Sequence, residues 1–395
     1  MIAAERRPDV DKLVEGLKHQ FQAQNNLLPS PTNPFYIVTP AFTRLSAGVK
    51  VLHALCHYLN LLGEQAYLVI HPTETVADSH WPFFARFPRE PLANPDLLSP
   101  ILTRETADLH FKRGLTPITI YPEVFDDPLQ APFIARYILN YPGLLAPKYK
   151  TPHHLAVCYS RLLAEYVGAQ DVLHIPTVDL DFFYNRKQER TGTCFYAGKY
   201  KAIYGGDPGI LPRDSVEILR SDKMSREEIR EIFWSSRVFY CYEDTALAIE
   251  AALCGCAVSF IPNEHFRNGT IARHELGSSG FAWGNGQEAI NNAIQTVDRV
   301  EGRIRSIYSE VPAAIAAFAA LARAQACRVG YDKPVCLPYD MRKVFVRIDP
   351  PDQELPPRPR RLRTRVKSFA LNWVLPPQIA SIVFSNTAVW RRVFR

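Results

Sequence analysis

The chain has 395 residues, which exceeds an ordinary single domain and suits two domains of roughly 150–200 residues each. Apolar residues make up 47% and charged residues 22%, a composition that can bury a sizeable core and excludes a disordered chain. The 19 glycines and 8 cysteines exclude collagen-like and disulfide-dense proteins.

The formal net charge of +6 is unevenly distributed. Of the 46 Lys and Arg residues, nine lie in residues 356–395, which hold no Asp or Glu, so residues 1–355 carry 37 basic against 40 acidic residues. A near-neutral body argues against a general nucleic-acid-binding protein, which spreads basic charge over a folded face. The basic tail instead suggests contact with an anionic surface such as a membrane.

The sequence shows no sign of export or of a membrane span. Residues 1–10 are charged and lack the apolar segment of a secretory signal, and no run of about 18 uninterrupted apolar residues predicts a transmembrane helix. The cysteines are scattered through apolar segments, so we interpret them as buried, reduced thiols of a cytoplasmic protein. Cys254 and Cys256 form a close pair, but no second pair stands at zinc spacing, so we expect no metal site there.

An alternation of strand and helix patterns begins after a first helix and a proline-rich loop near residue 30. A helix is predicted at residues 47–62, with Ser46 placed to cap it and Gly63 to end it, and a short helix at residues 131–139. The strands expected in this first domain are residues 35–39, 66–70, 117–121, 155–158 and 172–175. A strand, a helix and a strand in this order imply a parallel sheet with right-handed crossovers.

A second α/β series follows a hinge near residues 180–192. A capping box of Ser225 and Glu228 predicts the start of one helix. Two further helices are expected at residues 246–253 and 288–323, and the second of them closes the domain. The expected strands are residues 194–197, 216–219, 238–241 and 257–261.

The predicted organisation is therefore two α/β domains, residues 1–180 and 181–330, and a tail, residues 331–395. The tail is proline-rich, then basic over residues 358–367, then apolar and aromatic over residues 369–394. A basic stretch beside an apolar segment that contains Trp is typical of an interfacial membrane anchor. The alternative is that the tail packs back on the first domain as a C-terminal helix, and both can hold together.

The strongest chemical signal lies in residues 239–263, which predict a strand, a polar turn, a helix, a glycine stop and a strand. The turn places the backbone N–H groups of Thr245, Ala246 and Leu247 at a helix N-terminus, where unpaired donors and the helix dipole attract a phosphate. Glu250, one turn further on, is placed to accept two hydrogen bonds from a ribose diol. The alternative is an ordinary crossover with a solvated Glu250.

This segment resembles the donor-binding signature of GT-B-type glycosyltransferases, in particular the retaining nucleotide-sugar class. That class carries Glu-x7-Glu, then Ala, a Cys-Gly pair and an apolar strand, and Glu-Ala-Ala-Leu-Cys-Gly-Cys-Ala-Val at residues 250–258 matches the second half. Glu243 stands seven positions before Glu250, so the first half departs as Glu-x6-Glu. The resemblance implies that Glu250 binds the ribose and that Tyr242 and Glu243 lie at the donor site. Residues 242–247 look like a branch found among bacterial surface-polysaccharide transferases.

Basic residues are the next candidates for the donor site. Phe-Tyr-Ala-Gly-Lys-Tyr-Lys at residues 195–201 resembles the position at which the family holds a basic residue against the donor diphosphate. Lys199 is the first choice, and Lys201 and Arg220 are the second. A lysine or arginine there stabilises the charge on the departing nucleoside diphosphate. Solvated lysines at a strand end are the alternative.

In the first domain the candidates are Gly48 and Glu123. Gly48 lies after the first strand, where the family has a glycine-containing loop that faces the cleft, and a glycine allows close backbone approach. Glu123 follows the third strand at the carboxyl edge of the sheet, where ligands bind, so it is a candidate for acceptor contact or proton transfer. A plain helix-start glycine and a structural carboxylate are the alternatives. Asp179 and Asp181 fall at the hinge and are interpreted as linker.

Together these patterns predict an α/β protein of GT-B architecture, with two Rossmann-like domains facing across a cleft and a basic C-terminal tail. By resemblance, the second domain binds a nucleotide sugar and the first a glycan or lipid-linked acceptor; transfer retains the anomeric configuration and needs no metal or cofactor. We expect a cytoplasmic enzyme of bacterial surface-polysaccharide or lipopolysaccharide synthesis, peripheral at the inner membrane and without a nucleic-acid partner. A nucleotide-sugar epimerase and a non-catalytic scaffold of a polysaccharide assembly complex are the alternatives.

Overall fold

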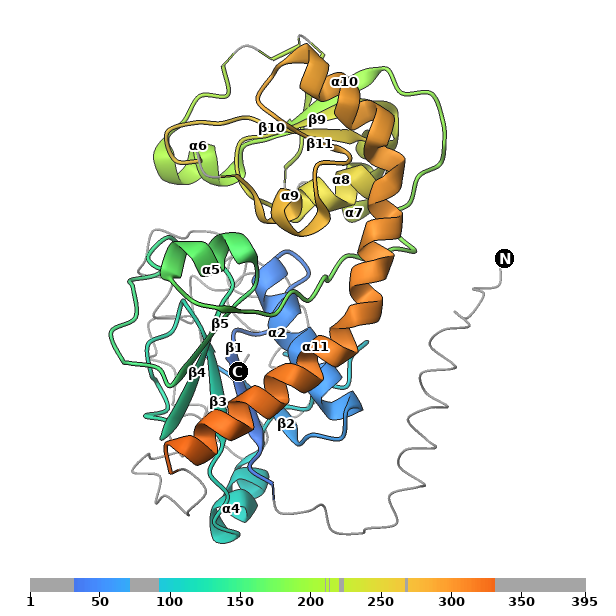
Figure 1. Cartoon of the computed structure of the whole chain (residues 1–395). Helices are drawn as coiled ribbons and strands as arrows, with labels where there is room; N and C mark the ends of the chain where they lie inside the picture. The colour runs from blue at the N-terminus through green and yellow to red at the C-terminus, as the bar shows by residue number, and fades with distance from the viewer. Residues whose placement is uncertain are drawn as a thin grey trace, which may run out of the picture.

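The computed structural model describes residues 32–71, 92–209, 211–212, 214–219, 224–266 and 269–330. They form two α/β domains, each with one all-parallel sheet, which stand one above the other in Figure 1. A linker after β6 and the long helix α11 connect the domains. The first predicted helix, Arg220, and the tail with its two expected placements lie outside the described residues.

The first domain has a six-stranded sheet in the order β2-β1-β3-β4-β5-β6. Its strands are β1 (Phe35–Thr39), β2 (Ala66–Ile70), β3 (Ile118–Pro122), β4 (Phe133–Ile138), β5 (Leu155–Cys158) and β6 (Asp171–Val172). Its helices are α2 (Ala47–Leu61), α4 (Arg104–Lys112) and α5 (Arg161–Val167). The predicted start and stop of α2 are confirmed, because the Ser46 side chain accepts a hydrogen bond from the Val49 N–H and Gly63 has a φ of 85°.

The predicted helix at residues 131–139 is wrong, because this segment forms the strand β4. All six of its residues are buried, as in the strands of a parallel sheet that is covered on both faces, and most are aromatic or β-branched. Arg136 is fully buried, and its guanidinium donates hydrogen bonds to the carbonyl oxygens of Pro122, Phe125 and Asp126. A buried charge in an apolar run concealed the strand pattern.

The second domain has a five-stranded sheet in the order β11-β10-β9-β7-β8. Its strands are β7 (Gly192–Tyr196), β8 (Val216–Glu217), β9 (Ser236–Cys241), β10 (Ala257–Phe260) and β11 (Phe281–Trp283). Its helices are α6 (Gly198–Tyr204), α7 (Arg226–Ser235), α8 (Leu247–Leu253), α9 (Ile271–Leu276) and α10 (Gln287–Thr296). The capping box of Ser225 and Glu228 at the start of α7 is confirmed, since both of its hydrogen bonds are present.

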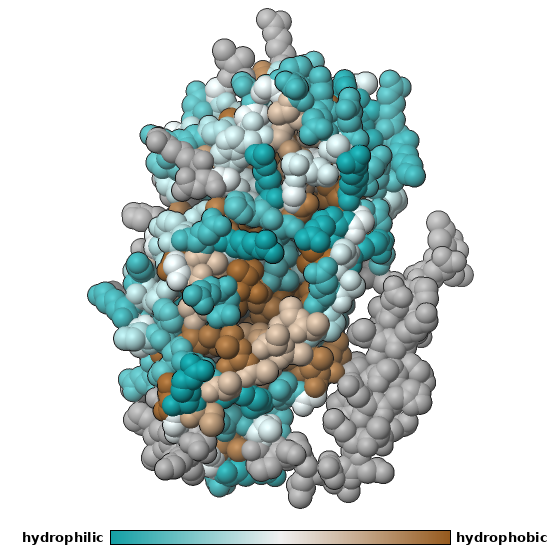
Figure 2. All heavy atoms as spheres, in the orientation of Figure 1, coloured by the Kyte–Doolittle hydropathy of each residue, from teal (hydrophilic) through white to brown (hydrophobic). Residues whose placement is uncertain are grey.

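The long helix expected at residues 288–323 is α10, a 3₁₀ turn (Val297–Arg299) and α11 (Val300–Arg328). Only the first half of α11 closes the second domain, because its second half packs in the core of the first domain through Ile315 and Phe318. Figure 2 shows apolar side chains along this second half. By length and composition alone, Gln287–Arg328 is also able to cross a membrane.

All seven cysteines in the described part of the chain are free thiols. Six are buried, as expected: four lie on helices and strands, and Cys254 and Cys256 lie in the turn between α8 and β10. Cys327 is exposed near the end of α11, so the expectation of buried cysteines is wrong there. Cys336 falls outside the described residues.

Both sheets reverse their strand order at an equivalent place. In the first sheet the reversal lies between β1 and β3, and in the second it lies between β7 and β9. Ligands of open α/β sheets bind outside the carboxyl ends of the strands at such a reversal. The domains also meet where α5 faces α9, and the Arg161 N–H donates to the Glu275 carboxylate at 2.9 Å. The fold therefore predicts a ligand site between the two reversals.

Candidate functional site

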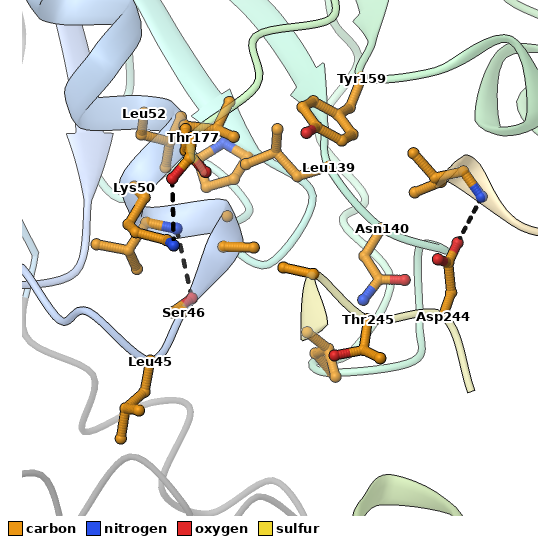
Figure 3. A pocket seen from close by; sticks show the side chains of 18 of the residues that line it. Leu45, Ser46, Lys50, Leu52, Leu139, Asn140, Tyr159, Thr177, Asp244 and Thr245 are labelled. Atoms are coloured by element: carbon orange, nitrogen blue, oxygen red, sulfur yellow. Dashed lines mark hydrogen bonds between the residues drawn. The ribbon is translucent and has the colours of Figure 1, made fainter. Parts of the chain in front are cut away.

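A cavity of about 240 Å³ lies between the domains, and both strand-order reversals contribute to its wall (Figure 3). The first domain supplies the loop after β1, the start of α2 and the residues that follow β3 and β4. The second domain supplies the end of β7, the turn after β9 and one face of α8. A smaller cavity of about 150 Å³ adjoins it, and the two share the residues Leu45, Lys50, Thr177 and Glu250.

The first-domain wall of the larger cavity is mostly apolar. Its aliphatic residues are Leu45, Val49, Val51, Leu52, Val124, Leu139, Leu145 and Val178. Gly48 lines this wall as predicted, and an added Cβ would meet Leu139 Cδ1 at 3.5 Å, which is an ordinary contact. The protein itself therefore does not require a glycine there. Lys50 lies at the edge and donates from Nζ to the Thr177 carbonyl oxygen at 3.4 Å.

Glu123 lines the same wall and is only 4% exposed. Its Oε2 accepts a hydrogen bond from the Leu139 N–H at 2.9 Å, so the carboxyl group joins the end of β3 to the end of β4. Burial raises the pKa of Glu123 to about 7, although backbone N–H groups and the Arg136 guanidinium act in the opposite direction. A carboxyl group with this pKa can hold or release a proton near neutral pH.

Lys199 and Glu243 lie together on the second-domain wall, as the sequence predicts. Glu243 follows β9, and its Oε2 accepts hydrogen bonds from the Lys199 and Tyr200 N–H groups at 2.5 and 3.0 Å. The Lys199 Nζ lies 3.7 Å from Glu243 Oε1 and donates to the Asp244 carbonyl oxygen at 3.2 Å. The start of α6 is thereby held against the turn after β9.

The turn after β9 and the start of α8 match the prediction in part. Thr245 and Ala246 line the larger cavity, whereas Leu247 lines the smaller one. The helix α8 begins at Leu247, and the Leu247 N–H donates to Thr245 Oγ1 at 3.3 Å. One of the three N–H groups expected to meet a phosphate thus already has an acceptor.

Glu250 occupies the junction of the two cavities. It is 7% exposed, and within the described part of the chain no hydrogen bond reaches its carboxylate. A buried carboxyl group gains free energy from hydrogen-bond partners, so a carboxyl group that lines two cavities and meets no donor among the described residues is suited to a ligand with hydroxyl donors. Of the predicted residues, Glu250 has the placement that most favours ligand contact.

Two predicted donor residues do not line either cavity. Lys201 Nζ lies 2.5 Å from the carboxylate of Glu217 on β8, so its charge is paired away from both cavities. The Tyr242 hydroxyl donates to the Pro208 carbonyl oxygen at 2.6 Å, and its ring stacks on that of Tyr200. Both predictions of direct donor contact are therefore unsupported by the placement of these side chains.

Sequence reasoning missed several residues of the cavity wall. Asp244 is the clearest case: it follows β9, and its Oδ2 accepts a hydrogen bond from the Ile271 N–H at 2.8 Å. Burial raises its pKa to about 6. Its place in the polar turn after β9 was a usable signal. Asn140 was missed because the β4 segment was interpreted as a helix, whereas Tyr159 directly follows the predicted strand β5 and could have been found from that position.

The smaller cavity is lined by opposite charges from both domains and the linker. Its ionisable residues are Arg44, Lys50, Asp96, Asp179, Arg226 and Glu250. Asp179 belongs to the linker, as expected, and its Oδ1 accepts hydrogen bonds from the Asp181 and Phe182 N–H groups. Its other carboxylate oxygen lies 3.9 Å from the Arg226 guanidinium. A ligand here would meet both donors and acceptors of hydrogen bonds.

Comparisons with known proteins give weak likenesses. No protein-family model matches the chain, and no curated protein matches it in sequence. Among solved structures, the chain is similar to the glycosyltransferase SnogD from Streptomyces nogalater, with 14% identity and a TM-score of 0.34 over 74% of this chain and 99% of that one. It is also similar to the calicheamicin glycosyltransferase CalG4, with 11% identity and a TM-score of 0.33 over 76% of this chain and 100% of that one. A third similar structure is the spinosyn rhamnosyltransferase SpnG, with 12% identity and a TM-score of 0.32 over 74% of this chain and 100% of that one.

Proposed function

We propose that this protein is a GT-B-type glycosyltransferase that moves a sugar from a nucleotide-sugar donor to an acceptor held on the first domain. The observation that supports it most is the pair of adjoining cavities at the two strand-order reversals, with Glu250, whose carboxylate accepts no hydrogen bond from the described residues, at their junction. Two substrates must meet in such a reaction. A site built from both domains offers each substrate a wall of its own.

The donor fits the second-domain side of the cavities. Glu250 accepts hydrogen bonds from the ribose diol, and the nucleoside occupies the smaller cavity, where charged residues meet the polar edges of a base. The Lys199 ammonium and the Thr245 and Ala246 N–H groups lie towards the diphosphate in the larger cavity. Stabilising the negative charge of the leaving nucleoside diphosphate lowers the barrier to transfer.

The acceptor fits the apolar first-domain wall, where Glu123 is the candidate for contacting its hydroxyl or taking its proton. Closure of the domains around both substrates would exclude water, which otherwise competes as an acceptor. We further propose that transfer retains the anomeric configuration and needs no metal. The acceptor is a glycan or a lipid-linked saccharide of bacterial surface-polysaccharide synthesis. The basic, Trp-containing tail supports a place at the cytoplasmic face of the membrane.

A thermal-shift panel tests the proposed function. Wild-type protein is heated with UDP, GDP, CMP, ADP or dTDP and with their common sugar conjugates. A ligand that binds only the folded state at about 100 times its Kd adds about 2.7 kcal/mol to the free energy of unfolding. We expect one nucleotide and its conjugates to raise the melting temperature. No shift with any nucleotide contradicts the proposal and favours the non-catalytic scaffold. In a separate product assay with the nucleotide sugar and no acceptor, release of an altered sugar favours the epimerase.

A further inference from the structure

The carboxylate of Glu243 is held inside the protein through one of its two oxygens. The helix α6 lacks a side-chain cap of its own, because Ala197 stands at its N-cap position. Glu243 Oε2 takes this role from the neighbouring strand and accepts hydrogen bonds from the Lys199 and Tyr200 N–H groups at 2.5 and 3.0 Å. Its Oε1 is buried, accepts no hydrogen bond from the described residues and lies 3.7 Å from Lys199 Nζ. Neither oxygen of Glu243 is therefore open to a ligand hydroxyl.

This contact fixes the position of a positive charge. The helix α6, which carries Lys199, follows β7, and Glu243 follows β9, so the contact connects the two strands at the reversal. The start of α6 is crowded, since an added Cβ at Gly198 would collide with the Tyr196 ring unless that ring moved. The Lys199 ammonium is held between Glu243 and the Asp244 carbonyl oxygen, at the wall of the larger cavity.

Asp244 is placed differently from Glu243. Its Oδ2 accepts one hydrogen bond, from the Ile271 N–H at 2.8 Å, which fixes the orientation of the carboxyl group. No hydrogen bond from the described residues reaches its Oδ1. Figure 3 shows Asp244 around the same cavity as Thr245, Asn140 and Tyr159. A fixed carboxylate with a free oxygen can accept hydrogen bonds from a polyol at a defined angle.

We propose that Asp244 contacts the hydroxyl groups of the transferred sugar, and that Glu243 is a positioning residue that holds Lys199 and the start of α6. This inference rests on the proposed function, because it presumes a nucleotide-sugar donor. It differs from what the sequence signature implies, which places the first glutamate of the pair at the donor. The turn here has one residue fewer between its two glutamates, and its first glutamate caps α6.

Two isosteric variants, Glu243→Gln and Asp244→Asn, test the division of roles. The Kd of each is measured by calorimetry for a nucleoside diphosphate and for its hexose conjugate, using UDP with UDP-glucose, GDP with GDP-mannose, ADP with ADP-glucose and dTDP with dTDP-glucose. Asp244→Asn is expected to weaken the conjugate about tenfold and to change the diphosphate less than twofold, because it alters only the contact to the sugar. Glu243→Gln is expected to change both Kd values by the same factor, because it acts through Lys199.

The opposite pattern overturns the inference: a change in the ratio of the two Kd values in Glu243→Gln, or equal effects on both ligands in Asp244→Asn. Hydrogen exchange supplies a readout that needs no ligand. The Lys199 and Tyr200 N–H groups are expected to lose protection in Glu243→Ala and to keep it in Asp244→Asn. Retained protection in Glu243→Ala refutes the positioning role. If wild-type protein binds no nucleotide, the role of Asp244 fails with the proposed function, whereas hydrogen exchange still decides that of Glu243.

Discussion

Glu123 makes the stability of this protein depend on pH in a direction that the structure specifies. Its pKa is about 7 in the folded chain, against 4.5 as the ordinary value, because burial disfavours the charged form. Between these two values the folded state keeps a proton that the unfolded state has lost. Stability therefore falls as the pH rises through this window, by about 1.4 kcal/mol for each unit of pKa difference, or about 3 kcal/mol in total. Below pH 4.5 the Glu123 carboxyl group is protonated in both states, so it adds nothing to the pH dependence of stability there.

The variant Glu123→Gln removes this titration and keeps an oxygen that can accept from the Leu139 N–H. Urea unfolding of wild-type protein and variant is measured from pH 4.5 to 8.5, and the difference in the free energy of unfolding cancels all other titrating groups. As the pH rises across this range, the free energy of unfolding of the variant is expected to increase by about 3 kcal/mol relative to that of wild type, with most of the change between pH 5 and 7. Glu288→Gln, an exposed glutamate on α10, is the control and should show no such trend.

A difference that does not change with pH would refute the reasoning, since it would mean that Glu123 titrates normally in the folded chain. A loss of stability of the variant at high pH would refute it more strongly. In that case the ionised carboxylate is favoured by its backbone donors, and burial does not dominate its pKa. Either result would also remove the argument that Glu123 can exchange a proton near neutral pH.

The remaining predictions concern α11 and the tail. Ile315→Ala should lower the free energy of unfolding by about 2–5 kcal/mol, because Ile315 is fully buried in the core of the first domain. The control Ala313→Ser, on the exposed face of α11, should change it by less than about 0.5 kcal/mol. Equal effects of the two variants in urea unfolding would contradict the packing of α11. A chain ending at Leu355 should lose flotation with vesicles that contain phosphatidylglycerol, because it lacks nine basic residues and the aromatic segment; full flotation would contradict the membrane proposal.

The parallel sheets could be predicted from sequence because their strands are short apolar runs that alternate with helices. The segments at residues 35–39, 66–70 and 257–261 lie where the pattern placed them, within one residue. The strand β4 could not be predicted, because Arg136 interrupts its apolar run. The Arg136 guanidinium is satisfied by carbonyl oxygens of the β3–β4 connection, and the sequence pattern does not show that these oxygens lie near it. The return of α11 to the first domain depends on the arrangement of two domains, which periodicity in one helix does not encode.

The candidate site was predictable where a residue follows a strand at the carboxyl edge. Glu123 was predicted in this way, whereas Lys199 and Glu250 were predicted from their resemblance to a donor-binding signature, and all three line one pair of adjoining cavities. Direction of the side chain was not predictable. Lys201 turns to Glu217 on the neighbouring strand, and the Glu243 carboxylate turns to the start of α6. Such choices depend on partners from other strands, which sequence spacing does not reveal.

The most direct test of the proposed function is the affinity of Glu250→Ala for the nucleoside diphosphate that stabilises the wild-type protein, measured by calorimetry beside Glu288→Ala as the exposed control. Loss of two hydrogen bonds from a ribose diol to a carboxylate at the junction of the cavities predicts a Kd that rises about 10- to 100-fold, with the control unchanged. An unchanged Kd in Glu250→Ala would remove this carboxylate from the donor site and contradict the account.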